Sequence, residues 1–485
     1  MKTIPALAVF AIALFMLAAA PAQQPPAAPY ALPDVTARPW TGDLDGMIKR
    51  RQIRILVSYS KTFYFVDRGS QRGLAYDVGR LFEDDLNRKL QNKHVHVHVV
   101  FVPVVRDQFI PFLLEGRGDI AMANLTITPE RLKQVDFTEP TRRNVAEIVV
   151  TGPASASVTT VQELSGQEVY VRQSSSFRES LERLNAEFAK TGQAPVKLQL
   201  APENLESEDI LEMVSAGLVK ATIADDHIAE FWQQIFPKIV LNKNATIHTG
   251  GDIGWMIRKD SPQLKAELNA FLARYPQGSA RRNELLQKYL KNVNYVKDAV
   301  SQEERAKFER TVAFFRQYSG QYDLDYLLMA AQGYQESRLD QNAKSAVGAI
   351  GVMQVMPATG KELKVGDIRE TEPNVHAGVK YIRFMMDRYY EKEPMDALNK
   401  GLFTFASYNA GPGRIAQLRK EAAKRGLNPN VWFNNVELVA AEKIGCETVT
   451  YVSNIYKYYL AYKLLTKEHA ERAKAKESLK QETGR

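Results

Sequence analysis

The sequence predicts a multidomain protein in which a two-lobed α/β domain is followed by a mainly α-helical domain. Between residues 53 and about 275, short runs of β-branched residues alternate with helical stretches, which is typical of α/β architecture. From about residue 323 to 465 these runs disappear and helical periodicity dominates. The chain has 485 residues, more than one hydrophobic core usually organises.

The first residues have the features of an export signal. Lys2 precedes an almost unbroken apolar stretch over residues 6–20, and small residues that suit cleavage follow it. We therefore expect a signal peptide over residues 1–22 and a flexible leader, rich in Pro, Ala and Gln, over residues 23–45. An uncleaved signal that anchors the chain weakly is the alternative.

Composition narrows the compartment and the partners. Cys446 is the only cysteine, so the sequence offers neither an internal disulfide nor a lipid-attachment cysteine near the signal. The net charge of +8 favours a polyanionic neighbourhood, and the export signal makes the cell wall or a membrane surface a better partner than nucleic acid. We expect a periplasmic protein, with peripheral association at the inner face of the outer membrane as an option.

The α/β domain is predicted to cover residues 46–275, with its second lobe over about 151–248. Its strands are expected near residues 53–57, 95–102, 148–150, 169–171 and 221–224. Residues 276–322 form a charged, amphipathic stretch that is predicted to be a helical connector. A helical domain over 323–465 and a frayed, solvated charged tail over 466–485 complete the expected order.

Seven motifs in the first domain occur in an order and spacing that is similar to the periplasmic amino-acid-type solute-binding proteins of family 3. They lie at residues 73–77, 118–120, 125–131, 135–140, 169–176, 224–226 and 257–262. The resemblance implies two lobes that close on a small amino-acid or muropeptide ligand.

Five residues of this domain are candidate ligand-binding residues. Arg131 offers a planar guanidinium for a carboxylate, Ser175 and Ser176 precede a predicted helix, and Asp225 follows a buried strand and suits an ammonium group. By resemblance, Thr126 would join Arg131 on the first lobe. The alternatives are that Arg131 braces its own loop, that the serines only cap the helix, and that Asp225 lies in a solvated turn.

Three alternating histidines, His94, His96 and His98, would share one strand face. Three rings in a row do not surround a metal ion tetrahedrally, so we interpret them as an exposed strand face and predict no metal site and no cofactor.

In the second domain, apolar residues recur at helical spacing over residues 326–340, and Glu336 lies on the last turn. Apolar neighbours would raise the pKa of this carboxyl group toward roughly 6, so that it can deliver a proton at neutral pH. Asp340, one turn further, could be proposed as a second carboxylate, but it suits the polar loop after the helix better.

Four further blocks, at residues 348–357, 374–381, 407–413 and 447–452, make this domain resemble the soluble-lytic-transglycosylase family, which has a goose-lysozyme-like fold. Val352 and Ser407 depart from that pattern, which usually has Leu and Ala. With the first domain ahead of it, the chain resembles the membrane-bound lytic murein transglycosylase F type. The resemblance therefore implies a periplasmic-binding-protein-like domain followed by a lysozyme-like domain.

The resemblance also implies a reaction, in which the β-1,4 bond between N-acetylmuramic acid and N-acetylglucosamine of peptidoglycan is cleaved and 1,6-anhydro ends form. Glu336 would act first as acid and then as base. Substrate contacts are expected from the remaining candidates: Ser337, Met353, Gln354, Tyr408, Asn409, Glu447 and Tyr451. Core packing is the alternative for Met353 and Tyr451, and also for Gln354, Tyr408 and Asn409. A non-catalytic glycan-binding sensor and a lysozyme-type hydrolase remain as alternative functions.

Overall fold

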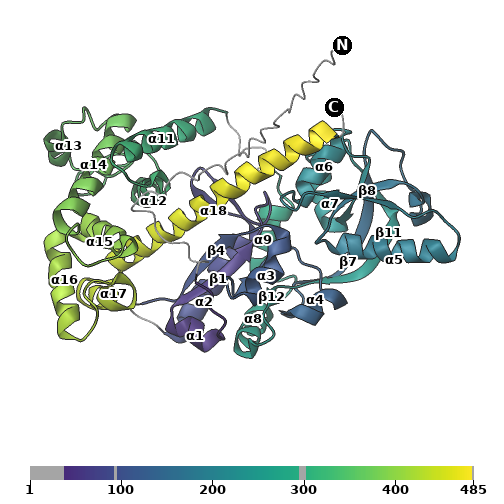
Figure 1. Cartoon of the computed structure of the whole chain (residues 1–485), viewed down its shortest axis with the longest axis horizontal. Coiled ribbons are helices and arrows are strands. Elements are labelled where there is room, and N and C mark those ends of the chain that lie inside the picture. The colour runs from purple at the N-terminus through teal and green to yellow at the C-terminus, as the bar shows by residue number, and fades with distance from the viewer. Residues whose placement is uncertain (1–37, 92–94, 294–301, 483–485) are drawn as a thin grey trace, which may run out of the picture.

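Figure 1 shows the chain as a computed structural model, which describes residues 38–91, 95–293 and 302–482. The expected signal peptide, most of the expected leader, and His94 lie outside the described residues. In the described part of the chain, a two-lobed α/β region precedes a helical domain, as predicted.

The first lobe contains a five-stranded mixed sheet in the order β4-β1-β5-β12-β6. β1 is parallel to β4 and β5, whereas β12 is antiparallel to β5 and β6. β1 is apolar on both faces because helices cover the sheet, except that buried Arg54 pairs with Asp119 at 2.9 Å. The strands are β1 (Gln52–Val57), β4 (His98–Pro103), β5 (Ile120–Ala121), β6 (Asp136–Phe137) and β12 (Met256–Ile257). A separate hairpin follows β1, made of β2 (Phe65–Asp67) and β3 (Ser70–Arg72).

The helices of the first lobe are mostly short. α2 is the longest, and it packs against β4 and β3. The set comprises α1 (Leu44–Lys49), α2 (Leu74–Leu90), α3 (Phe109–Leu114), α4 (Pro129–Gln134) and α8 (Pro262–Arg274).

The second lobe contains a five-stranded sheet in the order β11-β7-β10-β8-β9. Strands β7 and β11, the first and last of the lobe in chain order, are long and antiparallel to each other. Their ladder runs from Val240 opposite Thr151 to Ile253 opposite Arg142. These two strands carry the chain into and out of the lobe, so the lobe spans residues 142–253, somewhat more than the sequence suggested. The strands are β7 (Arg142–Thr151), β8 (Glu168–Arg172), β9 (Lys197–Ala201), β10 (Ala221–Asp225) and β11 (Val240–Ile253). The helices are α5 (Ser176–Lys190), α6 (Ser207–Ser215) and α7 (Asp226–Gln233).

The rear domain is helical, and its core contains fully buried side chains such as Met353, Phe403 and Trp432. Among the residues that the structure describes, no helix has both the length and the hydropathy that crossing a bilayer requires. The helices are α11 (Gln302–Gln321), α12 (Tyr326–Ser337), α13 (Pro357–Leu363), α14 (Thr371–Tyr389), α15 (Ala397–Ala410), α16 (Pro412–Lys424), α17 (Glu437–Ile444) and α18 (Cys446–Glu482).

The expected connector over residues 276–322 is divided between the two domains. Helix α9 (Ala280–Leu290) packs on α2, where the buried Tyr289 donates a hydrogen bond to Asp77 at 2.9 Å. Helix α11 packs on α12 and α14, and Tyr318 donates to Glu372 at 2.7 Å. Each amphipathic half therefore buries its apolar face against the nearer domain.

The expected charged tail is helical rather than frayed, although most of its described side chains are exposed. Helix α18 continues to Glu482 and passes from the rear domain to the second lobe, as its yellow ribbon shows (Figure 1). There Lys476 lies 2.7 Å from Asp209 and 3.0 Å from Glu212 of α6. Lys476 is held in place because α6 presents two acidic side chains to it.

The middle of α18 forms much of the interface between the domains. Its Lys457 lies 3.1 Å from Glu83 of α2, and Tyr462 donates a hydrogen bond to the carbonyl of Gly69 at 2.7 Å. Arg51, before β1, pairs with the buried Glu437 of α17. The two domains are thus joined by buried polar contacts as well as by the chain itself.

Candidate active site and ligand cleft

Helix α12 positions Glu336 at its C-terminal end. Asp325 caps the helix by accepting a hydrogen bond from the amide of Leu327 at 2.9 Å, and buried residues from Leu328 to Tyr334 anchor the helix in the core. The helix ends where Arg338 adopts a left-handed conformation, with φ of 60°. Glu336 therefore lies on the last turn, half-buried, at the edge of the core.

The carboxyl group of Glu336 has a raised pKa. Burial raises this pKa to about 7, although a hydrogen bond from Tyr451 opposes the shift. The hydroxyl of Tyr451 donates to Oε1 of Glu336 at 2.5 Å, and Gln332 donates to that hydroxyl at 3.3 Å. A single carboxyl group is thus desolvated and held in one orientation.

Tyr408 of α15 lies beside the same carboxyl group. Its hydroxyl donates to the carbonyl of Met353 at 2.7 Å. Burial raises the pKa of Tyr408 well above its usual value, and the nearby charge of Glu336 acts in the same direction. The structure therefore brings together Glu336, Tyr408 and Tyr451 from three helices that are distant in sequence.

Ser337 and Gln354 use their polar atoms to hold the loop between α12 and α13. Ser337 donates to the carbonyl of Val352 at 2.8 Å. Gln354, with φ of 47°, donates to the carbonyl of Gly351 at 2.9 Å and to that of Ala343 at 3.2 Å. This loop also carries the carbonyl that Tyr408 contacts.

The side chain of Met353 is fully buried, so it does not line a sugar subsite as we expected. A Cβ atom at Gly378 would lie 2.5 Å from this side chain, and one at Gly333 would lie 3.2 Å from its sulfur. The glycines of α12 and α14 leave room for the Met353 side chain, which packs against both positions. Core packing, the alternative, describes its position.

The remaining candidates are peripheral. Asn409 is exposed and accepts a hydrogen bond from Thr448 at 2.7 Å, while Glu447 is exposed on the first turn of α18. Asp340 is also exposed and accepts from the amide of Asn342 at 2.9 Å, as a polar loop residue does.

Sequence reasoning missed two buried amides that support the site. Asn374 accepts a hydrogen bond from the amide of Met353 at 2.8 Å and donates to two backbone carbonyls. It therefore fixes the loop between α12 and α13 to α14. Gln332 contacts Tyr451, as described above. Both lie on otherwise apolar helix faces, a signal that buried polar residues leave in the sequence.

The five predicted ligand-binding residues of the first domain line one cavity of about 810 Å³ between the lobes: Thr126, Arg131, Ser175, Ser176 and Asp225. Arg131 donates to the carbonyls of Thr126 at 2.7 Å and Ser174 at 2.9 Å, one on each lobe. Burial lowers its pKa to about 10. Ser175 caps α5, and Ser176 lies 3.2 Å from Thr126 across the cleft.

Further contacts join the lobes. Arg106 of the first lobe lies 2.8 Å from Glu206 of the second, and Asn124 donates a hydrogen bond to Asp225. Neither Arg106 nor Glu206 was predicted. The lobes are therefore in direct polar contact around the cavity.

Asp225, which lines the cleft, and Glu147, on the adjacent strand, are both buried acidic residues. Burial and the neighbouring Glu147 raise the pKa of Asp225 to about 7. Glu147 is 1 % exposed and lies opposite Asp225 on the adjacent strand, and in the described part of the chain its carboxylate oxygens have no hydrogen-bond partner. In the sequence, Glu147 stands out as a charged residue within the apolar part of β7, and this pattern could have indicated a buried carboxyl group.

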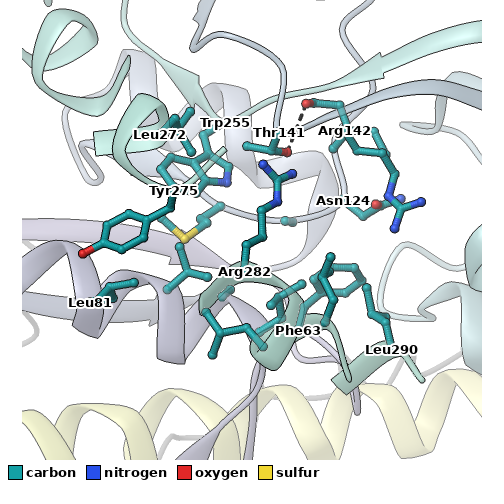
Figure 2. Close-up of a pocket in the computed structure, with 18 of the residues that line it drawn as sticks. Phe63, Leu81, Asn124, Thr141, Arg142, Trp255, Leu272, Tyr275, Arg282 and Leu290 are labelled. Atoms are coloured by element: carbon teal, nitrogen blue, oxygen red, sulfur yellow. Dashed lines mark hydrogen bonds between the residues drawn. The ribbon is translucent and has the colours of Figure 1, made fainter. Parts of the chain in front are cut away.

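A smaller apolar cavity of about 120 Å³ lies beneath α9, close to the strands that connect the lobes. Figure 2 shows Arg282 extending from α9 toward Thr141 and Trp255, with Arg142 and Asn124 beside it. Burial lowers the pKa of Arg282, and the charge of Arg142 acts in the same direction. The volume of this cavity is below the ~150 Å³ of a cavity that binds benzene. The cavity is therefore too small for the ligand expected in the cleft.

Comparison with known proteins agrees with this division. Residues 53–292 match the model of bacterial extracellular solute-binding proteins, family 3, and residues 313–430 match that of the transglycosylase SLT domain. The chain joins a family 3 solute-binding domain to a transglycosylase SLT domain. Glu336, Tyr408 and the loop around Gln354 all belong to the SLT domain.

Relatives share both domains. A protein of Desulfosudis oleivorans named membrane-bound lytic murein transglycosylase F is 27% identical over 84% of this chain and 89% of its own length. A protein of the same name from Pseudomonas fluorescens is 25% identical over 84% of each chain. Among solved structures, an ancestral arginine-binding protein is 22% identical, covers 49% of this chain and 97% of its own, and has a TM-score of 0.41.

Proposed function

We propose that the chain is a peptidoglycan lytic transglycosylase in which Glu336 is the catalytic residue. The observation that carries this proposal is the half-buried carboxyl group in the SLT domain, whose pKa is raised to about 7 and which Tyr451 orients. At neutral pH a large fraction of such a group is protonated, so it can serve as an acid and, once ionised, as a base.

The proposed reaction needs one carboxyl group. Glu336 donates its proton to the glycosidic oxygen as the bond from that oxygen to C1 of the muramic residue breaks, and the N-acetyl group stabilises the developing cation. The carboxylate then takes the proton of the 6-hydroxyl as O6 bonds to C1 and closes the 1,6-anhydro ring. No water is consumed. Tyr451 stabilises the carboxylate between the two steps through its hydrogen bond.

Substrate contacts are proposed for the polar groups around Glu336. The hydroxyl of Tyr408 donates to Met353, so its lone pairs are available to an acetamido N–H. Gln354 and Ser337 shape the loop beside the carboxyl group. Asn409 and Glu447 are exposed at the ends of α15 and α18, where an extended glycan strand would pass.

The experiment is a digestion of purified murein sacculi by the full chain. Glu336→Gln should reduce product release by more than roughly 1,000-fold and leave the circular dichroism spectrum unchanged, because the amide cannot donate an acidic proton. Glu391→Gln, at an exposed position of the same domain, is the matched control and should retain wild-type activity. Near-wild-type cleavage by Glu336→Gln would refute the assignment.

Mass spectrometry of the products separates the alternatives. Anhydro ends support transglycosylation, whereas products heavier by one water identify a lysozyme-type hydrolase. If the wild-type chain binds sacculi and releases no products, the glycan-binding sensor is the better description.

For the first domain we propose a small amino-acid or muropeptide ligand in the cleft. The supporting features are the fit of the family 3 domain, the guanidinium of Arg131 for a carboxylate, and the desolvated carboxyl groups of Asp225 and Glu147 for a cationic group. The polar contacts that join the lobes around the cleft would have to adjust when such a ligand enters.

We also propose that this ligand regulates cleavage, with α18 as the physical link. The same helix carries Tyr451, which orients Glu336, and Lys476, which contacts α6 of the second lobe. Movement of that lobe would therefore act on the helix whose Tyr451 orients the catalytic group.

The proposed location is the periplasm, where the substrate lies. The family 3 model describes extracellular proteins, and the expected export signal agrees with it. The net charge of +8 suits a peripheral contact with anionic cell-wall polymers or membrane surfaces.

A further inference from the structure

A pocket of about 450 Å³ lies between the two domains, next to the end of α12. The hairpin of β2 and β3 forms one wall, and residues of α12 and α18 form the other. The charged and aromatic residues that line it are Asp67, Arg68, Arg72, Tyr76, Tyr334, Arg338 and Tyr458. Neither domain makes this pocket alone.

The hairpin is held firmly against α12. Gly69 has φ of 82°, and a Cβ atom there would lie 2.7 Å from the ring of Tyr334. Tyr462 of α18 donates a hydrogen bond to the carbonyl of Gly69 at 2.7 Å. This close approach requires a residue without a side chain, so the wall of the pocket is built into the fold.

The pocket is cationic. Three arginines and one aspartate line it, a balance of +2. Asp67 lies 2.9 Å from Arg72 and 3.5 Å from Arg68. Within the described chain, the contacts of Arg338 are aromatic rather than acidic: its guanidinium lies 4.6 Å from the centre of the Tyr334 ring and donates to the hydroxyl of Tyr458 at 3.2 Å.

The pocket lies within reach of a substrate bound at Glu336. Tyr451, which contacts Glu336, and Tyr458, which lines the pocket, are separated by seven residues on α18, or about 10 Å along the helix axis. An extended peptide covers that distance with about three residues. Murein stem peptides hang from muramic acid, the sugar whose bond is proposed to break, and they carry free carboxylates.

We propose that this interdomain pocket binds the anionic stem peptide of the strand being cleaved. The guanidinium groups of Arg72 and Arg338 would receive a peptide carboxylate, and the rings of Tyr334 and Tyr458 would pack against its apolar part. The proposal rests on the proposed function. It makes the solute-binding domain a direct contributor to substrate recognition, through the hairpin.

The test compares two substrates of the full chain: glycan strands with their stem peptides, and the same strands after an amidase has removed them. The wild-type chain should have a lower KM for the peptide-bearing strands. In Arg72→Ala the ratio of the two KM values should move toward unity by roughly 10-fold, because a charge-assisted contact is lost. Arg72→Lys, which keeps the charge, should recover part of the ratio.

Arg369→Ala is the matched control, since it removes an exposed arginine that pairs with an aspartate on the SLT domain outside the pocket. It should leave both KM values unchanged. Equal KM values of the wild-type chain for the two substrates, or an unchanged ratio in Arg72→Ala, would overturn the stem-peptide site while the proposed reaction stands. Failure of the wild-type chain to cleave either substrate would overturn the proposed function itself.

Discussion

A glutamate at the end of an α-helix is usually ionised at neutral pH. Glu336 differs because its carboxyl group is turned into the junction of three helices, where burial disfavours the charged form. Tyr451 donates to the carboxylate and limits the shift. The pKa near neutrality is therefore the balance of desolvation against one hydrogen bond.

This balance predicts the pH dependence of cleavage. The protonated form of Glu336 is the active acid, so kcat/KM should fall as the pH rises through about 7. Tyr451→Phe removes a bond that favours the ionised form, so the alkaline limb of the profile should move to higher pH while the rate at pH 5.5 drops by roughly 10-fold. The measurement is a pH–rate profile on soluble glycan strands. Tyr326→Phe, elsewhere on α12, should leave the limb in place.

The role of Met353, also at the scale of a single residue, is to pack in the core of the SLT domain. Met353→Ala should lower the free energy of unfolding of the SLT domain by about 2–5 kcal/mol, because it leaves a cavity between Gly333 and Gly378. Calorimetry checks the stability, and steady-state kinetics well below the melting temperature should give a KM near that of the wild type. A large rise in KM without loss of stability would restore Met353 to the sugar site.

At the scale of elements, α18 connects every functional part of the molecule. It carries Tyr451 beside Glu336, Tyr458 beside the interdomain pocket, and Lys476 against α6. Between them, Lys457 enters the interface with the first lobe and pairs with Glu83. Although burial opposes its ionisation, Glu83 has a pKa held below its usual range by the charge of Lys457.

We expect Lys457→Met to destabilise this interface. The change leaves the carboxylate of Glu83 buried beside His98 with Arg80, 2.6 Å away, as its remaining ion-pair partner, so the loss of one charged contact should cost about 1.5–3 kcal/mol. Calorimetry should show a lower first transition than in the wild type. Lys443→Met, at an exposed position of α17, is the control for loss of a charge. An unchanged transition in Lys457→Met would mean that the ion pair contributes little to the interface.

At the scale of the whole molecule, the two lobes are held together around the cleft by Arg106, which lies 2.8 Å from Glu206. Arg106 also donates a hydrogen bond to the carbonyl of Asn124 in its own lobe at 3.3 Å. The ion pair therefore biases the lobes toward the arrangement seen in the structure.

Arg106→Ala should open the lobes and change the cleavage rate, if the lobe position acts on the SLT domain through α18. Small-angle X-ray scattering should report a larger radius of gyration, and sacculus digestion should report the rate. Arg143→Ala, an exposed arginine on β7, is the control. An opened molecule with an unchanged rate would argue against regulation by the first domain.

The sequence by itself determined the architecture and the residues that can carry chemistry. Strand and helix periodicity separated the two domains, and motif order indicated a solute-binding domain followed by a transglycosylase domain. The position of Glu336 on the last turn of an amphipathic helix was also visible, because helical spacing depends on neighbouring residues alone.

Only the tertiary structure decided which side chains meet. Tyr451 and Tyr408 reach Glu336 from helices that lie far along the chain, and the burial of Met353 depends on two glycines that leave room for its side chain. Near the end of the charged tail, Lys476 meets acidic partners on α6. These contacts join segments more than 15 residues apart, and local sequence patterns do not specify distances of that kind.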